Sequence, residues 1–531
     1  MSKTITMKKH YDAIVIGAGH NGLVCAYKLA DKGKSVLVLE ANNQVGGLAA
    51  TREFSPGFNA SVAHLMPQMN QQLLKDMQLE KFGFSWAKQS INTIVLDDPQ
   101  AANNNGEHIT LSADGVEGIT SEEQSAYQAY TALMTKYSKT LLPFWHKMPP
   151  RIGVKDLQQN LTLGQFALRI KALGKTDMRE FTRIFALPAQ DLMDEFFTNP
   201  LLKAALSWDI NIGNKLAPRS PNNALLNLWY RSSGDINGKG YLSAQMPLPK
   251  GGMGGLTQAM AKACTANGVD IICDSPVAKV SVVDHKVTGV ELASGQHVAA
   301  NVVISNAGAK TSFLHLLGAE HLQIQFTHRI NRIRNKGMVA KLHIALNQLP
   351  TFTGVTTPDA RLLITPSMGY IENAFDYAKY GEIPEHPALE VLIPSMVDGS
   401  LAPNGQHVMS VNIQYVPHTV KGGWQENKAQ LLTNVMQVLR QYAPNIDDCI
   451  VASELLTPAD LEQQFNVDGG HWHHGELAID QWWMNRPTYG TAQYKTPIPG
   501  FYLCGAGAHP GGGIMGAAGS NAAKEVLSNE F

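Results

Sequence analysis

The chain has 531 residues, of which 44% are hydrophobic and only 16% are charged. This length exceeds one ordinary hydrophobic core, so at least two domains are expected. The 43 basic side chains nearly balance the 44 acidic ones, which argues against a nucleic-acid partner, because such proteins carry a basic footprint. The low charge fits a large buried fraction, and it is also compatible with an apolar partner or a peripheral membrane contact.

The cysteines and the apolar runs exclude further classes of protein. The five cysteines are scattered without a C-x-x-C pair, so neither a disulfide framework nor a dithiol relay is expected. Residues 1–10 lack the apolar core of a secretory signal. The uncharged stretch 496–523 holds eight glycines and three prolines, so we expect no transmembrane segment there. We therefore expect a cytoplasmic protein, with a membrane-peripheral location as the alternative.

The first predicted elements form a β-α-β unit. Residues 11–16 are a short apolar run that ends at a glycine, which predicts a buried strand. Residues 21–32 have a helical period that stops at Gly33, and residues 35–40 predict a second strand. Two strands in this order should be parallel, with a right-handed crossover.

A glycine fingerprint joins the first strand to the first helix. Gly17, Gly19 and Gly22 form G-x-G-x-x-G, in which the first glycine permits a tight turn and the second admits a pyrophosphate. The third glycine allows close packing of helix and strand. Glu40 ends the next strand, where a carboxylate can accept both ribose hydroxyls and disfavours a 2′-phosphate. The motif predicts a dinucleotide site that is not for NADP.

The middle of the chain predicts helices first and strands afterwards. Residues 100–118 are polar and predict a hairpin or loop, and residues 121–208 predict a helical cap. The aromatic side chains of this cap are better explained by core packing than by an apolar tunnel; they are Phe181, Phe185, Phe196 and Phe197. Strands are predicted at 269–272, 278–283, 287–292, 298–305, 337–346 and 408–415, with a helix at 426–442.

Three further motifs point to the cofactor. Gly46 and Gly47 follow the ribose acid by some six residues, which resembles the extended fingerprint of FAD enzymes. Val277 begins a strand where related FAD enzymes bring a valine backbone to the adenine. The C-terminal run 501–514 predicts a strand, a glycine loop and a helix that opens near Ile514 and stabilises charge on a reduced flavin. Its predicted flavin contacts are Gly505, Gly507, Gly513 and Ile514.

These ordered motifs resemble the phytoene desaturase-like family of FAD-dependent oxidoreductases, which has carotenoid and retinoid desaturase, saturase and flavin-type ketolase branches. The likeness spans nearly the whole chain, and residues 473–487 look most like the ketolase branch. Many flavoproteins with this glycine pair continue with arginine, whereas this chain has Leu48, which weakens a resemblance to amine oxidases.

The resemblance implies an α/β fold with a discontinuous Rossmann-type FAD-binding domain and a mixed α+β substrate domain that carries the helical cap. The expected FAD-binding segments are 1–70, 250–320 and 460–531. The substrate domain is expected from 71–249 and 321–459, with the cap at about 121–208.

The expected activity is that of an FAD-dependent dehydrogenase, desaturase or ketolase acting on a large apolar polyene- or isoprenoid-like substrate, with hydride transfer to the flavin. A flavin amine or amino-acid oxidase and a non-catalytic prenyl or lipid carrier are the alternatives. His509 is the first catalytic candidate, because its loop lies beside the flavin in the resemblance, and His474 and Glu476 follow. His471 and His473 share one face of a predicted strand, but without paired cysteines or a carboxylate triad no metal is expected.

Overall fold

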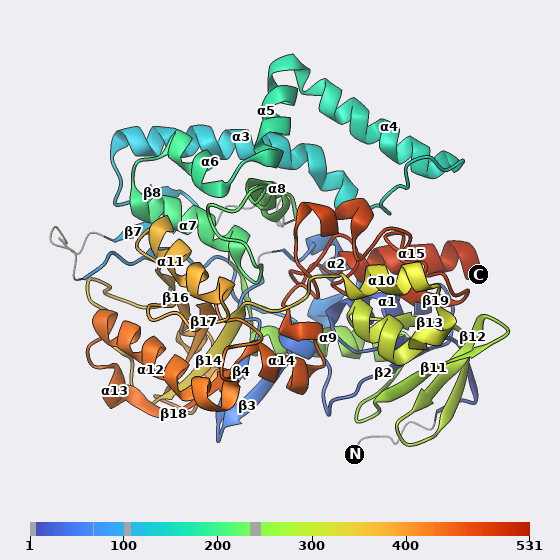
Figure 1. The fold of residues 1–531 in the computed structure, drawn as a ribbon. Coiled ribbons are helices and arrows are strands. Elements are labelled where there is room, and N and C mark those ends of the chain that lie inside the picture. The colour runs from blue at the N-terminus through green and yellow to red at the C-terminus, as the bar shows by residue number, and fades with distance from the viewer. Residues whose placement is uncertain (1–6, 67, 100–107, 234–245) are drawn as a thin grey trace.

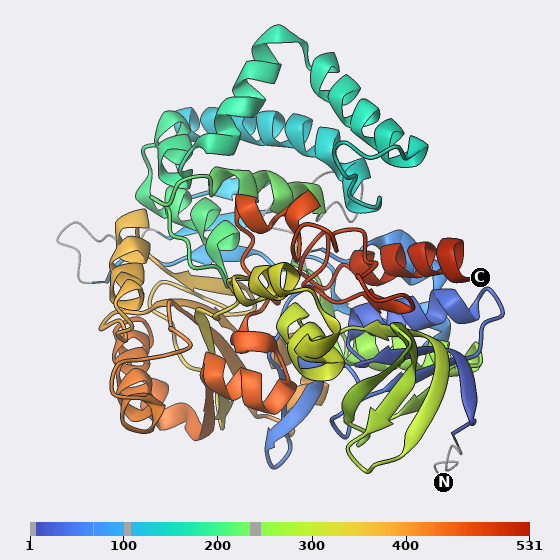
Figure 2. The same ribbon diagram turned by 45° about the vertical axis from the view of Figure 1, so that its right-hand side comes forward.

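The computed structural model of the chain describes residues 7–66, 68–99, 108–233 and 246–531. Two β-sheets lie side by side, and a layer of helices covers one end of them (Figure 1). The same helical layer stands above both sheets in the turned view of Figure 2. The arrangement confirms the predicted α/β fold with a second, mixed α+β part and a helical cap.

The first sheet has seven strands that come from three distant parts of the chain. Its order is β10-β2-β1-β13-β12-β11, with β19 beside β13. The strands are β1 (His10–Ile16), β2 (Val36–Leu39), β10 (Asp270–Ile272), β11 (Val277–Val283), β12 (Lys286–Leu292), β13 (His297–Ser305) and β19 (Phe501–Leu503). β1 pairs in parallel with β2, and α1 (His20–Ala30) connects them, so the predicted β-α-β unit is confirmed. The predicted domain boundaries stay a prediction.

The second sheet has eight strands in the order β18-β14-β17-β16-β15-β6-β7-β8. They are β6 (Thr93–Val95), β7 (Ile109–Ser112), β8 (Gly115–Glu117), β14 (Val339–Leu346), β15 (Arg361–Ile364), β16 (Ala388–Leu392), β17 (His407–Gln414) and β18 (Ile450–Leu456). β7 and β8 form the hairpin expected near 100–118, although residues 100–107 lie outside the described ranges. One face of this sheet is apolar, since Leu342 and Val411 pack with Leu439 of α12 (Trp424–Tyr442).

The helical cap is built from the six helices between residues 121 and 233. They are α3 (Ser121–Trp145), α4 (Leu157–Ala172), α5 (Gly174–Ala186), α6 (Ala189–Phe196), α7 (Pro200–Asn211) and α8 (Ala224–Ser233). Phe181 and Phe197 are buried in the core of this cap, and Phe185 and Phe196 pack against that core. These four side chains therefore pack as predicted. Among the residues that the structure describes, no helix has the length and apolarity needed to cross a bilayer.

The last helix packs on the first one. α15 (Ala517–Glu530) contacts α1 so closely that a Cβ atom on Gly519 would lie 2.0 Å from the Asn21 carbonyl oxygen. The prediction that a helix opens near Ile514 is wrong by three residues. Ile514 and Gly516 have φ angles of 47° and 69°, which a right-handed helix excludes, so α15 begins only after them.

Candidate functional site

A large cavity lies where the two sheets and the C-terminal loops meet. Its volume is about 1810 Å³ with the solvent-open part included, and its wall takes Ile16 and Leu39 from the first sheet. Arg361, Glu390 and Asn412 line it from the second sheet. Both sheets therefore contribute side chains to one cavity wall.

Backbone without side chains forms one wall of the cavity. Gly17, Gly19, Gly46 and Gly47 all line it, and the glycine pair reaches the fingerprint because Gly46 N–H donates to Ala18 O at 2.9 Å. Gly513 lines the cavity from the C-terminal loop. Such bare backbone next to the start of a helix is what a pyrophosphate requires.

Three of the predicted glycines do not line the cavity, and two of them serve close packing. A Cβ on Gly22 would lie 2.2 Å from the Gly17 carbonyl oxygen, so this glycine lets α1 approach the end of β1. A Cβ on Gly505 would lie 2.5 Å from the Asn306 carbonyl oxygen. Gly507 lies near His474, outside the lining.

Glu40 and Val277 mark one part of the cavity wall. The Glu40 carboxylate accepts hydrogen bonds from the backbone N–H groups of Ala18, at 2.7 Å, and of Asn42, at 3.0 Å. Burial raises its pKa, and these N–H donors act against that rise. Because an ionised carboxylate has about four acceptor positions, Glu40 can still accept ribose hydroxyls.

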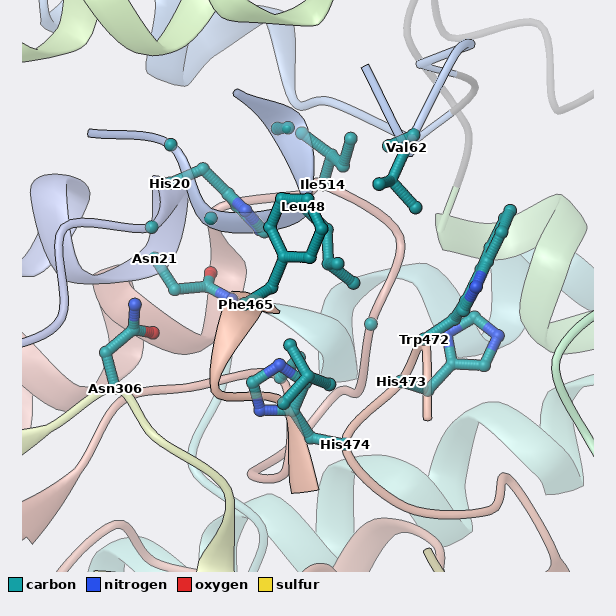
Figure 3. A pocket seen from close by; sticks show the side chains of 18 of the residues that line it. His20, Asn21, Leu48, Val62, Asn306, Phe465, Trp472, His473, His474 and Ile514 are labelled. Atoms are coloured by element: carbon teal, nitrogen blue, oxygen red, sulfur yellow. The ribbon is translucent and has the colours of Figure 1, made fainter. Parts of the chain in front are cut away.

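Another part of the wall is built from histidines and apolar side chains (Figure 3). His20, the first residue of α1, points into the cavity on the side of Asn21 and Asn306, and Trp472 and His473 lie on the opposite side. Burial lowers the pKa of His20 to about 4, as it does for His473, so both rings are neutral at pH 7. The apolar side chains of this part are Leu48, Val62, Leu65, Ile212, Phe465, Trp472 and Ile514.

The three catalytic candidates lie in different surroundings. His474 lines the cavity, and its Nδ1 atom has no hydrogen-bond partner within the described ranges. Glu476 lies off the wall, where its carboxylate accepts a hydrogen bond from Arg334 Nε at 2.7 Å. His509 is also off the wall: its Nε2 atom donates to Phe144 O at 2.9 Å and its ring stacks on Trp145.

The prediction of a strand through His471 and His473 is wrong. The segment is a chain of turns, because Gly469, Gly470 and His474 all have positive φ angles that interrupt extended backbone. His471 Nδ1 accepts from the backbone N–H of His473, and the centroids of the two rings are 5.9 Å apart. Within the described part of the chain, no group of three metal-ligating side chains occurs.

A polar patch on the cavity wall was not predicted from the sequence. It consists of His64, Asp209, Arg361, Glu390 and Asn412, all buried. These five residues are spread over almost 350 positions of the chain, from His64 to Asn412. A signal was present, since the apolar strands β15, β16 and β17 each carry a charged or amide residue where burial predicts an apolar one.

The residues of the cavity fit FAD. The glycine-lined backbone leaves the space that a pyrophosphate needs, and a Cβ on Gly19 would lie 2.9 Å from the Asn306 amide nitrogen. Glu40 and Val277 flank this backbone on the same wall. The remaining space adjoins His474 and the C-terminal loop.

Comparisons with known proteins agree with this fit. Residues 22–527 match the family model described as flavin containing amine oxidoreductase. The chain is 32% identical to "Pyridine nucleotide-disulfide oxidoreductase domain-containing protein 2" of Rattus norvegicus, with 98% of this chain and 94% of that protein covered. A limonene dehydrogenase component of Castellaniella defragrans is 25% identical, with 98% of this chain and 95% of that protein covered.

Two further likenesses extend the comparison. Phytoene desaturase (lycopene-forming) of Pantoea ananas is 24% identical, with 97% of this chain and 98% of that protein covered. The solved structure of a putrescine oxidase variant matches with a TM-score of 0.64 at 14% identity, covering 98% of this chain and 99% of that one. The predicted FAD cofactor is confirmed, and the likeness to phytoene desaturases holds as a distant relationship. The chain belongs to the family of flavin-containing amine oxidoreductases and is an FAD-dependent oxidoreductase.

Proposed function

We propose that this enzyme oxidises a large isoprenoid- or polyene-like molecule by hydride transfer to FAD, as a dehydrogenase, desaturase or ketolase. The observation that carries the proposal is the apolar wall beside the C-terminal loop, formed by Leu48, Val62, Phe465, Trp472 and Ile514. Two relatives support it, because limonene and phytoene, after which they are named, are both isoprenoid hydrocarbons.

The FAD contacts are part of this proposal. Bound FAD supplies the acceptor of the hydride, so the protein has to position the substrate and exclude water. The fingerprint glycines with Gly46 and Gly47 would hold the diphosphate, Glu40 the ribose, and Val277 the adenine. Gly513 and Ile514 would lie against the flavin ring, while Gly505 and Gly507 shape their loop.

We assign the candidate acid–base role to His474, because it lines the cavity with an Nδ1 atom that accepts no hydrogen bond from the described residues. Burial lowers its pKa, so the neutral ring can accept a proton. We assign positioning roles to Glu476 and His509, since both lie behind the wall. Glu476 fixes Arg334, and His509 ties the C-terminal loop to α3.

A second candidate function is oxidation of an amine or amino acid on the same scaffold, which the description of the matched family favours. A non-catalytic carrier is set aside, because the chain is an FAD-dependent oxidoreductase.

Anaerobic mixing of the holoenzyme with defined compounds separates the two activities. We expect C15 to C40 isoprenoids in detergent micelles to bleach the visible flavin band, and putrescine and amino acids to leave it unchanged. Bleaching by the amines alone would replace the proposal with the amine oxidase.

We also propose that the enzyme contacts a membrane surface through α4. No residue of this helix is buried, and Leu157, Leu161 and Leu168 are 78%, 55% and 66% exposed. Their spacing of four and seven residues places them on one face. The only charged side chains of α4 are Arg169 and Lys171, which suits an anionic lipid surface. The helix extends along the outside of the cap (Figure 1).

Vesicle sedimentation tests this contact. We expect the protein to sediment with phosphatidylcholine vesicles that contain phosphatidylglycerol, and Leu161→Glu to reduce the bound fraction several-fold, because a carboxylate opposes insertion of this face. Ile324→Glu is the matched control, because Ile324 is 76% exposed on α10 (Ile324–Asn331), outside the cap. Equal binding of the wild type and the Leu161→Glu variant would contradict a contact through α4.

A further inference from the structure

Arg486 follows the short helix η9 (Trp483–Asn485) and is almost completely buried, with 1% of the residue exposed. Its Nη1 and Nη2 atoms donate five hydrogen bonds to backbone groups. The acceptors are the carbonyl oxygens of His473, Gly475, Glu476, Gln481 and Ala506. All of these acceptors are neutral, so the hydrogen bonds satisfy the donors of the guanidinium group but do not compensate its charge.

Arg486 differs in this respect from Arg361, the other deeply buried arginine of the cavity region. The Arg361 side chain is 2% exposed and pairs with the carboxylates of Asp209 and Glu390. Arg486 has no carboxylate partner in the part of the chain that the structure describes. Buried charges in proteins are normally paired, because an isolated charge loses its hydration without compensation. The missing partner of Arg486 is therefore expected to be a ligand rather than a side chain.

Four histidines near Arg486 carry no charge at pH 7. Burial, and to a smaller degree the charge of Arg486, lowers the pKa of His473 to about 4 and that of His509 to about 3. The same causes lower the pKa values of His471 and His474. Burial also lowers the pKa of Arg486, to about 9, which leaves its guanidinium group protonated at pH 7. A positive charge thus lies among neutral rings.

Arg486 lies directly behind the wall of the cavity. Its Nη2 atom donates to the carbonyl oxygens of His473 and Ala506, and both of these residues line the cavity. A Cβ atom on Gly511 would lie 3.5 Å from Nε, which has no hydrogen-bond partner among the described residues. Gly511 belongs to the loop that brings Ile514 to the wall, where Figure 3 shows it. The charge thus lies behind the loop that is proposed to lie against the flavin ring.

The start of α15 adds a second reason for a charge at this place. The sequence predicted that a helix opening near Ile514 would stabilise the reduced flavin with its positive end. The helix begins instead at Ala517, after the left-handed residue Gly516. Because the field of a helix terminus falls off within its first turn, this displacement reduces its effect at the loop. The protonated side chain of Arg486 can supply the positive potential there.

We propose that Arg486 is the counter-charge of the reduced flavin. In the oxidation a C–H bond of the substrate breaks, and its electron pair and the hydrogen move to FAD, whose ring becomes an anion. The second proton of the substrate goes to a base such as His474. The guanidinium group attracts the anion more strongly than the neutral oxidised ring, so it raises the reduction potential. Arg486 does not touch the substrate and is a positioning residue. The inference rests on the flavin placement given under the proposed function.

The midpoint potential of the bound flavin, measured by anaerobic reduction beside redox dyes, tests this role. We expect Arg486→Gln to weaken binding of reduced relative to oxidised FAD at least about tenfold, which lowers the potential by about 30 mV for a two-electron couple. Glutamine keeps hydrogen-bond donors for the carbonyl groups but carries no charge. Tyr494→Phe is the matched control, because the buried Tyr494 hydroxyl donates to the carbonyl oxygen of His509 in the same loop at 3.0 Å. It should lower thermal stability and leave the potential unchanged.

The wild-type holoenzyme gives a second measurement that needs no variant. The photoreduced enzyme is titrated with acid, and absorption spectra distinguish the anionic from the neutral reduced flavin. We expect the bound flavin to stay anionic at least about one pH unit below the point at which free reduced FAD takes up a proton, because the charge of Arg486 opposes this proton. His20 and His473, which face the cavity, have pKa values of about 4 and stay neutral above that pH.

Three results would overturn the role of Arg486. They are an unchanged potential in a folded Arg486→Gln protein, an equal fall of the potential in the Tyr494→Phe protein, and protonation of the wild-type reduced flavin at the pH of free FAD. None of these measurements uses a substrate, so they do not depend on whether the enzyme oxidises isoprenoids or amines. A failure of the proposed function appears instead as bleaching of the flavin by amines alone.

Discussion

Replacing Arg361 by methionine is expected to lower the free energy of unfolding by about 3–5 kcal/mol, because it leaves two buried carboxylates without their shared cation. The Arg361 side chain is 2% exposed, and those of its partners Asp209 and Glu390 are 8% and 4% exposed. Methionine fills much of the same volume, so the loss reports charge rather than a cavity. Urea unfolding followed by tryptophan fluorescence measures the change.

Arg183 provides the matched control. It also bridges two carboxylates, Glu180 and Glu195, but its side chain is 40% exposed. Water screens such a pair, so Arg183→Met should cost no more than about 1 kcal/mol. A double variant Arg361→Met with Glu390→Gln should recover part of the loss. Similar small losses for both arginine variants would show that the carboxylates of the wall are not held by charge.

Gly22→Ala is expected to weaken FAD binding by at least about tenfold and to destabilise the protein by about 1–3 kcal/mol, the usual cost of overpacking. The added methyl group would lie 2.2 Å from the Gly17 carbonyl oxygen and 3.1 Å from the Asn306 amide nitrogen. The Gly17 carbonyl group cannot yield without moving α1 away from β1, and this movement opens the glycine-lined wall. The ratio of bound flavin to protein and equilibrium dialysis with FAD measure the effect.

Gly164→Ala separates this packing effect from helix propensity. Gly164 lies inside α4, and a Cβ there would meet no atom within 4 Å. Alanine favours a helix over glycine by about 1 kcal/mol at either position, so propensity alone predicts that both variants gain stability. We expect the gain only at Gly164, with FAD content unchanged. Full FAD content in the Gly22→Ala variant would contradict the packing role of this glycine.

Local patterns were sufficient to predict the first strands of the first sheet and their parallel pairing. Strands such as β1 and β2 are short apolar runs, and their pairing follows from the helix between them. Glycines are equally informative, because Gly17 and Gly46 lie in conformations that other residues rarely adopt. The cofactor prediction depended on these positions and was confirmed.

Long-range contacts explain what the sequence did not reveal. Asp209 comes from α7, and Arg361, Glu390 and Asn412 come from three strands that are neighbours in the sheet but are separated by long connections in the chain. No spacing rule connects them. Likewise, the direction in which His509 points depends on Phe144 and Trp145, more than 360 positions earlier, which no local pattern specifies.

The contact between α15 and α1 has a consequence for biosynthesis. The ribosome makes β1 and its glycine turn well before β19 and α15, which complete the same sheet and support its first helix. Until residue 530 has been made, the nascent chain therefore lacks part of the sheet and of the helix packing that form the flavin site, and the side of α1 that packs on α15 is uncovered. Capture of FAD therefore has to follow the synthesis of α15, and the unfinished chain is the state that depends most on chaperones.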